Sequence, residues 1–316
     1  MSGLSLITTG AALPSKCVTN DDLSQMVDTN DEWIKSRTGI RKRYFIGDNE
    51  TITDLSIQAA RQAYERSGLG PEDIGAVICC TMSSDFGIPA TACLIQEALG
   101  LSEDCAVMDV NVACTGFIYG MAVLNGILAT MGGRYGILVG ADQFSKVLDM
   151  TDRSTCVIFG DGAGAAVFEY SDEADYDAVL GAHGSKMLTT PGYGVEGFLE
   201  MDGKGIFRFA VESIPKCLNN LLSKAGVTLD DVDYVVCHQA NERIIDHCIK
   251  SLKAPEGLFY KNIDHTGNTG AASIPVALNE MYEMDMLTPG QTLVCVGFGG
   301  GLSWGGIILK YKGGAK

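Results

Sequence analysis

The sequence predicts an α/β protein built from two duplicated halves. Residues 67–80 (SGLGPEDIGAVICC) align without a gap with residues 225–238 (AGVTLDDVDYVVCH). Each tract follows an amphipathic helical pattern and then enters a short β-branched run typical of a buried parallel strand. The match resumes at 113–116 (ACTG) and 267–270 (GNTG), so the repeat extends well beyond one helix and one strand.

The elements of the two halves follow in the same order. Apolar residues at helical spacing predict a helix that ends at Gly68 and another that ends at Gly226. Strands are predicted next, at 76–80 and 234–238. Helices rich in small residues follow at 117–129 and 271–284, and further strands at 135–142 and 292–300. Residues 184–205 are rich in glycine and lack periodicity, which indicates a loop or cap.

We place the two halves at residues 1–170 and 171–316. No linker rich in Pro, Gly, Ser or charge separates them, so we expect one compact unit. The first half would carry a nucleophilic cysteine, and the second a histidine and an asparagine.

Composition excludes several classes of protein. The 316 residues are 46% hydrophobic and 20% charged, which suits a folded globular chain, and the net charge of −16 argues against binding to nucleic acid or to an anionic membrane. No uninterrupted apolar run approaches the roughly 18 residues of a membrane span, and the N-terminus lacks the basic start of a signal peptide. Eleven cysteines without CxxC spacing fit a reducing compartment better than disulfides or structural zinc. We therefore expect a soluble, cytoplasmic protein.

Cys114 is a candidate nucleophile. It lies between a strand-like run and a helix that opens with Thr115-Gly116. The unpaired amides and the macrodipole at a helix N-terminus stabilise a thiolate, and can lower a cysteine pKa from about 8.5 to roughly 3.5–7.5. The alternative is that Cys114 is one more small buried hydrophobic residue, as most of the other cysteines must be.

His238 and Asn268 are candidate partners of Cys114. His238 closes a predicted strand, and the C-terminal end of a strand delivers side chains to the active face of an α/β layer. Asn268 is equivalent to Cys114 in the repeat. A Cys/His/Asn set could therefore converge on the pseudo-twofold axis, although a lone histidine is more often structural.

Three motifs point to other chemistry and are better explained by packing. Residues 160–165 (GDGAGA) resemble a dinucleotide fingerprint, but a strand-like run follows where a helix is required. Residues 301–305 (GLSWG) fit the esterase GxSxG pattern around Ser303, yet no helix and no later histidine follow. Cys79 and Cys80 would lie on opposite faces of a strand, which favours burial over redox chemistry.

Several long blocks resemble β-ketoacyl-acyl carrier protein synthase III, a family of the thiolase superfamily. They are DEWIKSRTGI, DVNVACTGF, TDRSTCVIFGDGAGAAV, CHQANERI, HTGNTGAASIPVAL and GFGGGLSWG, and they cover nearly the whole chain in order. The resemblance implies a five-layered αβαβα fold made of two duplicated halves, which agrees with the repeat, and it implies a homodimer.

The resemblance also implies a mechanism. Cys114 would attack an acyl-CoA thioester to form an acyl-enzyme, and His238 and Asn268 would hold the oxygen of malonyl-carrier protein as decarboxylation builds an enolate. The turn at 299–301, through Gly300, would join the amide of Cys114 in holding the oxyanion of the acylation step. The family uses no metal and no other cofactor, because CoA is part of a substrate and phosphopantetheine arrives on the carrier protein.

Two groups of binding residues follow from the same blocks. Trp33, Arg37 and Arg153 match residues that bind CoA, where an aromatic ring and guanidinium groups suit adenine and phosphate; surface ion pairs are the alternative for both arginines. Docking of the acidic carrier protein would fall to a local cationic patch of Arg243, Lys250 and Arg208, and should be salt-sensitive.

The chain departs from the family at two places. Ile88 stands where many members carry a phenylalanine that reaches from the partner subunit into the acyl pocket, so a different primer length or shape is expected. The segment at 184–205 is shorter than is typical, which predicts a different pocket wall.

The sequence therefore predicts an enzyme that initiates type II fatty-acid synthesis. It would condense an acyl-CoA primer, with acetyl-CoA expected, with malonyl-carrier protein. The alternatives are an acyltransferase of secondary metabolism with the same triad, a thioester hydrolase that uses Ser303 or acyl-Cys114 and water, and a scaffold without activity.

Overall fold

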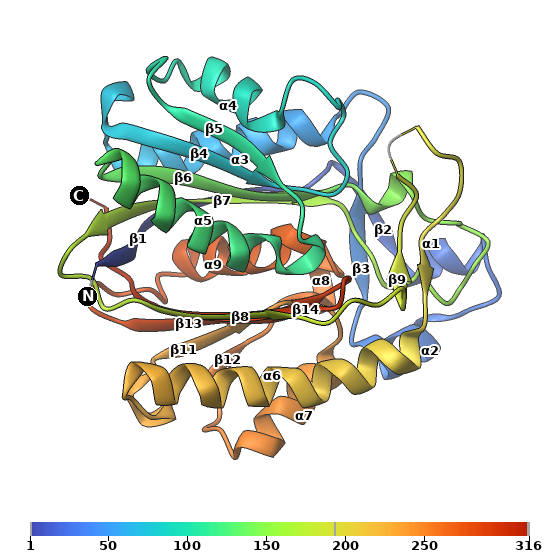
Figure 1. Cartoon of the computed structure of the whole chain (residues 1–316). Coiled ribbons are helices and arrows are strands. Elements are labelled where there is room, and N and C mark those ends of the chain that lie inside the picture. Colours follow the sequence, from blue (N-terminus) through green and yellow to red (C-terminus); the bar gives the residue numbers. More distant parts are fainter. Residues whose placement is uncertain (1, 193, 315–316) are drawn as a thin grey trace.

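The computed structural model describes residues 2–192 and 194–314 and contains two five-stranded sheets (Figure 1). The first sheet has the strand order β1 (Gly3–Ala12), β7 (Gly162–Ser171), β6 (Tyr135–Asp142), β4 (Ile74–Cys80) and β5 (Ala106–Val110). The second sheet has the order β8 (Asp177–Ala182), β14 (Ser303–Lys310), β13 (Thr292–Gly299), β11 (Tyr234–Cys237) and β12 (Phe259–Tyr260).

The two sheets have the same topology. In each, the first three strands of the order are antiparallel neighbours, and the last three are parallel neighbours. The strands of the first sheet end at Ser171, and those of the second begin at Asp177. The predicted duplication is therefore present strand by strand.

Helices form three further layers around and between the sheets (Figure 1). α3 (Ile52–Ser67) and α4 (Thr91–Leu99) cover the outer face of the first sheet, and α6 (Gly203–Ala225) and α7 (Glu242–Leu252) cover that of the second. α5 (Gly116–Met131) and α9 (Ser273–Glu283) lie between the sheets. The predicted five-layered αβαβα fold is confirmed.

The aligned tracts have the same local structure because glycine ends each helix. Gly68 (φ +69°) and Gly226 (φ +70°) both adopt the left-handed conformation that side chains disfavour. A single 3-10 turn follows each glycine, at Pro71–Asp73 and Leu229–Asp231, and leads into β4 or β11. The glycine stop and the strand that the sequence predicts are thus confirmed in both halves.

Shorter elements gather at one end of the sheets. They are α1 (Asn20–Ser24), α2 (Asp31–Thr38), α8 (Ile263–Thr266), the hairpin of β2 (Lys16–Thr19) and β3 (Lys42–Phe45), and the pair β9 (Leu188–Thr189) and β10 (Glu200–Met201). The segment predicted as a loop at 184–205 therefore holds one short ribbon and the start of α6.

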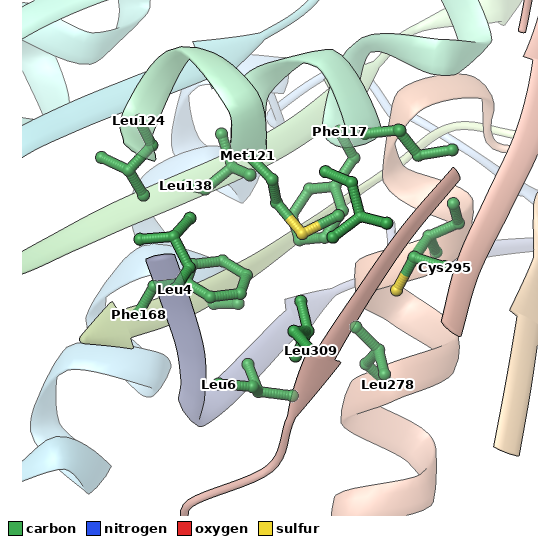
Figure 2. Packing of buried hydrophobic residues seen from close by; sticks show 14 of the residues in the cluster. Leu4, Leu6, Phe117, Met121, Leu124, Leu138, Phe168, Leu278, Cys295 and Leu309 are labelled. Atoms are coloured by element: carbon green, nitrogen blue, oxygen red, sulfur yellow. The ribbon is translucent and has the colours of Figure 1, made fainter. Parts of the chain in front are cut away.

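The central core lies between the sheets and is almost entirely apolar. Figure 2 shows Phe117, Met121 and Leu124 of α5 above Leu4, Leu6 and Leu309. Cys80 belongs to this core, whereas Cys79 packs under α3 and α4, so the two side chains point to opposite faces as predicted. All eleven cysteines are free.

The apolar composition of α5 follows from its position in the fold. Residues Ala113–Met131 are long and apolar enough, by length and composition, to cross a membrane, although polar residues such as Thr115 and Asn125 interrupt the apolar run. Half of this window is buried, and the helix runs between the two sheets (Figure 1). A helix with sheets on both sides needs apolar residues nearly all round, which accounts for its composition.

Candidate active site

The structure brings Cys114, His238 and Asn268 together in one pocket of about 90 Å³. Cys114 comes from the turn before α5, His238 directly follows β11, and Asn268 precedes the turn that opens α9. The three side chains are 7%, 2% and 5% exposed. The pocket thus draws its polar groups from both halves of the chain.

Close backbone packing positions Cys114. The turn Ala113–Thr115 holds Ala113 at a positive φ of 46° and leads straight into α5. A Cβ on Gly299, at the end of β13, would lie 3.0 Å from the backbone nitrogen of Cys114. Glycine at this position therefore lets the second sheet touch the backbone of the turn.

Burial also sets the charge state of Cys114. It raises the pKa of the thiol to about 12, and the nearby carboxyl of Asp142 adds to this shift. The expectation of a lowered pKa from the helix N-terminus is wrong for this pocket, because desolvation penalises the thiolate more strongly. The unliganded site therefore holds a neutral thiol near neutral pH.

His238 is held as a neutral imidazole. Its backbone N–H donates to the carbonyl of Val296 at 2.9 Å, and its Nδ1 lies 2.7 Å from Oγ of Ser273. The ring packs edge-on against Phe298, with 5.5 Å between centroids. Burial lowers the pKa of His238 to about 3, so the ring can offer a neutral N–H donor.

Asn268 is fixed by backbone pairing and by its own amide oxygen. Its N–H donates to the carbonyl of Ile158, and its carbonyl accepts from Gly160, both at 3.0 Å. The side-chain Oδ1 accepts the N–H of Gly270 at 3.0 Å. The amide oxygen is therefore engaged, and the NH₂ group is the part of the side chain that can donate into the pocket.

A second pocket, of about 110 Å³, lies on the other side of Cys114. Cys114 and Leu188 line both pockets, and Phe144, Asp142 and Gly300 line only the second. Burial raises the pKa of Asp142 to about 7, while its carboxyl accepts the backbone N–H groups of Met82 and Ala271. Cys114 can thus face two separate parts of one substrate.

The two motifs judged to be packing features have structural contacts. Ser303 is 3% exposed; its hydroxyl donates to the carbonyl of Gly300 at 3.1 Å and lies 2.8 Å from the hydroxyl of Thr115. It thereby ties the turn at 299–301 to the turn that carries Cys114. In the other motif, Asp161 accepts from Ser145 and Ile46, and β7 follows it.

The predicted CoA-binding residues form one cluster outside the pocket. The guanidinium groups of Arg37 and Arg153 lie 4.5 and 5.1 Å from the ring centroid of Trp33. Arg153 also donates to the backbone carbonyl of Asp28 at 2.8 Å. Both arginines are exposed and can be reached from solvent.

The predicted docking residues are exposed on α6 and α7. The guanidinium of Arg243 lies 5.6 Å from the ring centroid of Phe207, which itself lines the pocket of Cys114, His238 and Asn268. Lys250 lies two turns further along α7, and Arg208 follows Phe207 on α6. Arg243 therefore contacts a residue of the pocket wall.

Ile88 lies away from both pockets in the single chain. Its side chain is 90% exposed, and it does not line either pocket within the described residues. The structure therefore places it where a second molecule could contact it.

Sequence reasoning missed much of the apolar wall and the serine beneath His238. Leu188, Met201 and Phe207 come from or follow the aperiodic segment at 184–205, and Phe298 from a uniformly apolar strand. Ser273 had only a weak signal, since serine near the start of a helix is ordinary. Among the described residues, no group of three or more His, Cys, Asp or Glu is placed to hold a metal ion.

Comparisons with known proteins agree with this architecture. Residues 108–184 match the family model described as 3-oxoacyl-[acyl-carrier-protein] synthase III, and residues 222–311 match the model of its C-terminal part. The β-ketoacyl-[acyl-carrier-protein] synthase III of Clostridium beijerinckii is 42% identical over 329 residues, covering 98% of this chain and all of that protein.

Solved structures give the same result. The 3-oxoacyl-[acyl-carrier-protein] synthase III of Aquifex aeolicus is 38% identical with a TM-score of 0.91, covering 98% of this chain and 100% of that one. The priming β-ketosynthase of the R1128 polyketide pathway is 32% identical with a TM-score of 0.92, covering 98% and 96%.

The duplicated sheets and the solved relatives define this protein as a condensing enzyme, an acyltransferase with the thiolase-like fold. The sequence identity of about 40% to curated relatives over nearly the full length shows which family of condensing enzymes this is. The chain belongs to the β-ketoacyl-[acyl-carrier-protein] synthase III family, whose members initiate fatty-acid synthesis.

Proposed function

We propose that this chain joins an acyl-CoA primer to malonyl-acyl carrier protein by decarboxylative condensation through an acyl-Cys114 intermediate. The observation that carries the proposal is the shared pocket of Cys114, His238 and Asn268. One side chain in it can act as a nucleophile, and the other two can donate N–H groups without carrying charge. The products would be β-ketoacyl-carrier protein, CoA and carbon dioxide.

The first half-reaction is acyl transfer to Cys114. The sulfur attacks the thioester carbonyl, the bond from carbonyl carbon to the CoA sulfur breaks, and the thiol proton leaves with CoA. Backbone N–H groups of Cys114 and Gly300 would hold the oxyanion. The contact of Gly299 with the Cys114 backbone and the bond from Ser303 to Gly300 support this pairing.

The second half-reaction is decarboxylation and carbon–carbon bond formation. Loss of carbon dioxide leaves an electron pair as an enolate, whose oxygen would accept hydrogen bonds from Nε2–H of His238 and the NH₂ of Asn268. The enolate carbon attacks the carbonyl carbon of acyl-Cys114, and the carbon–sulfur bond breaks. The cysteine leaves as a thiolate, which takes a proton from solvent to restore the thiol. Neutral donors suit this step, since they are in place before charge develops.

The two pockets suggest how the substrates are divided. The pantetheine arm would enter the pocket of His238 and Asn268, and the acyl group would occupy the pocket of Phe144 and Asp142. A space of about 110 Å³ suits a short primer such as acetyl. The cluster of Trp33, Arg37 and Arg153 would bind the nucleotide end of CoA through stacking and phosphate contacts.

The carrier protein would dock beside Arg243. This cation is exposed and contacts the pocket wall at Phe207, so an acidic partner bound there could deliver its arm into the pocket. Arg208 and Lys250 would extend the cationic patch along α6 and α7. No metal or redox cofactor is required, because loss of carbon dioxide drives the second step.

We also propose a homodimer that works in a reducing compartment such as the cytoplasm. Ile88, Phe86 and Phe198 expose 90%, 51% and 56% of their surfaces, and β5 is an edge strand with Met108 exposed. Large apolar side chains left exposed in this way suit a protein interface. The eleven free cysteines support the reducing compartment.

The proposal is tested by intact-protein mass spectrometry. The enzyme is incubated with acetyl-, branched- and medium-chain acyl-CoAs and then with malonyl-carrier protein, and compared with Cys114→Ser. The expected result is an acyl adduct that requires Cys114 and disappears as β-ketoacyl-carrier protein forms. No adduct, or an adduct lost only to water, overturns the proposal.

A second candidate function rests on the similarity to the R1128 priming ketosynthase. That enzyme is named for a polyketide pathway and shares the fold at 32% identity. An acyl-Cys114 adduct that persists when malonyl-carrier protein is added would favour such a role, since the acyl group would then await a different acceptor. The same panel of acyl-CoAs therefore separates the two functions.

A further inference from the structure

Ser273 is in hydrogen-bond contact with His238, the histidine of the pocket. It is the first residue of α9, it is 2% exposed, and its Oγ lies 2.7 Å from Nδ1 of His238. The same oxygen accepts the backbone N–H of Gln239 at 3.4 Å. Because His238 and Gln239 are consecutive, one serine holds the segment that follows β11.

These two contacts decide where the hydroxyl hydrogen points. A serine hydroxyl has one hydrogen to donate and two lone pairs that accept. If Nδ1 carried a hydrogen, Oγ would receive two donors, and its own buried hydrogen would have no acceptor among the hydrogen bonds of the described residues. A buried donor without a partner costs more than a hydrogen bond normally gains. The geometry therefore favours donation from Oγ to Nδ1, which leaves the ring hydrogen on Nε2.

Burial acts in the same direction as this hydrogen bond. His238 is 2% exposed. Desolvation disfavours a second proton on the ring and lowers the pKa of His238 to about 3. The ring is thus kept neutral, and its one hydrogen is kept on the side away from Ser273.

We propose that Ser273 is a positioning residue for decarboxylation, which fixes the tautomer of His238 by donating a hydrogen bond to Nδ1. The inference rests on the proposed function, because the Nε2–H donor matters only if an enolate oxygen forms beside His238. Ser273 does not itself line the pocket. Without its hydroxyl, Nδ1 can take the hydrogen, and the lone pair then exposed on Nε2 repels the enolate oxygen.

The kinetic test compares Ser273→Ala with two variants. Ser273→Thr keeps the hydroxyl, and Ser56→Ala removes the same atoms from another buried helical serine, one that donates only to the carbonyl of Ile52. Ser273→Ala is expected to lower the rate of malonyl decarboxylation about ten- to a hundredfold and to change acylation of Cys114 less than about twofold. Ser273→Thr should recover most of the decarboxylation rate, and Ser56→Ala should leave both rates unchanged.

A spectroscopic test follows the tautomer itself. Nitrogen-15 NMR of the histidine-labelled protein distinguishes Nε2–H from Nδ1–H, and His238→Ala assigns the signal among the four histidines. Wild type should show Nε2–H, and Ser273→Ala should lose it. The inference is overturned if the wild type shows Nδ1–H. This test needs only the wild-type protein, so it can be made even if Ser273→Ala does not fold. The inference is also overturned if Ser273→Ala keeps Nε2–H.

His238→Ala separates this inference from the function on which it rests. If His238→Ala decarboxylates malonyl-carrier protein at the wild-type rate, the proposed role of His238 fails, and the NMR spectrum still decides what Ser273 does. If only His238→Ala is impaired and Ser273→Ala is fully active, the role of the serine fails instead.

Discussion

At the residue scale, desolvation determines the chemistry of the pocket. Cys114 and His238 are both almost fully buried, and burial shifts both pKa values toward the neutral forms, to about 12 and about 3. The pocket therefore combines an uncharged thiol with an uncharged imidazole. In the proposed mechanism, charge would appear only when a substrate reacts, at positions where N–H donors already lie.

The first prediction concerns the pH dependence of Cys114. Alkylation by iodoacetamide should accelerate steadily from about pH 6 to about pH 9, since the thiolate of a thiol with a pKa well above this range grows about tenfold per pH unit. Mass mapping of the alkylated peptide separates Cys114 from the exposed Cys17. A rate that levels off below about pH 8 would contradict the raised pKa of Cys114.

The second prediction concerns Gly299. Its Cβ would lie 3.0 and 3.1 Å from the backbone nitrogens of Cys114 and Thr115, too close without a shift of the turn. Gly299→Ala should therefore lower condensation about a hundredfold, because small displacements of catalytic groups are costly. Gly126→Ala, in α5 with nothing within 4 Å of the new Cβ, is the matched control. If Gly299→Ala turns over as fast as Gly126→Ala and the wild type, the role assigned to the turn is contradicted.

At the element scale, ion pairs tie α8 to α9 around the loop that carries Asn268. His265 of α8 lies 2.8 Å from Oδ1 of Asp264 and 3.0 Å from Oε2 of Glu280 in α9. Glu280 also accepts from the side chain of Asn262 at 2.9 Å. The loop that carries Asn268 thus lies between two helices, and the carboxylate of Glu280 holds these helices together.

The third prediction concerns the protonation of His265, whose contacts with Asp264 and Glu280 form a tether between α8 and α9. The hydrogen bond to Glu280, followed by that to Asp264, raises the pKa of His265, so the stabilisation is complete below about pH 6.5 and is lost as pH rises through the raised value. His265→Gln should therefore lower the melting temperature more at pH 6 than at pH 9. His247→Gln, at an exposed position on α7, is the control. A deficit that stays constant or grows with pH would contradict the tether.

At the scale of the whole molecule, the candidate active site lies where the two halves meet. The first half contributes Cys114 and the second contributes His238 and Asn268, so neither half could hold the pocket alone. Charge is also distributed unevenly over the surface. The chain has a net charge of −16, yet the cation of Arg243 lies beside the pocket wall. An acidic carrier protein would be repelled by most of the surface and attracted only locally.

The fourth prediction tests this local attraction. Arg243→Glu should raise the KM for malonyl-carrier protein about tenfold at low salt and leave acylation of Cys114 by acyl-CoA unchanged. The difference from wild type should shrink as salt screens the interaction. Arg61→Glu makes the same change in net charge on α3, in the layer on the opposite side of the molecule. Equal effects from both variants would show that net charge, and not the site beside Arg243, governs the association.

The sequence by itself determined the duplicated fold and the identities of the three polar residues of the pocket. The helix ends at Gly68 and Gly226 can be predicted from the order of the residues alone, without knowledge of packing. The register predicted for the second part of the repeat is wrong, because Cys114 is the middle residue of the turn before α5 and its counterpart in the turn before α9 is Ala271, not Asn268. Only the tertiary structure decided the raised pKa of Cys114, the neutral state of His238, the contact with Ser273 and the apolar wall from the segment at 184–205. These depend on how completely distant segments exclude water from one another, and burial is a property of the assembled layers that no single stretch of sequence contains.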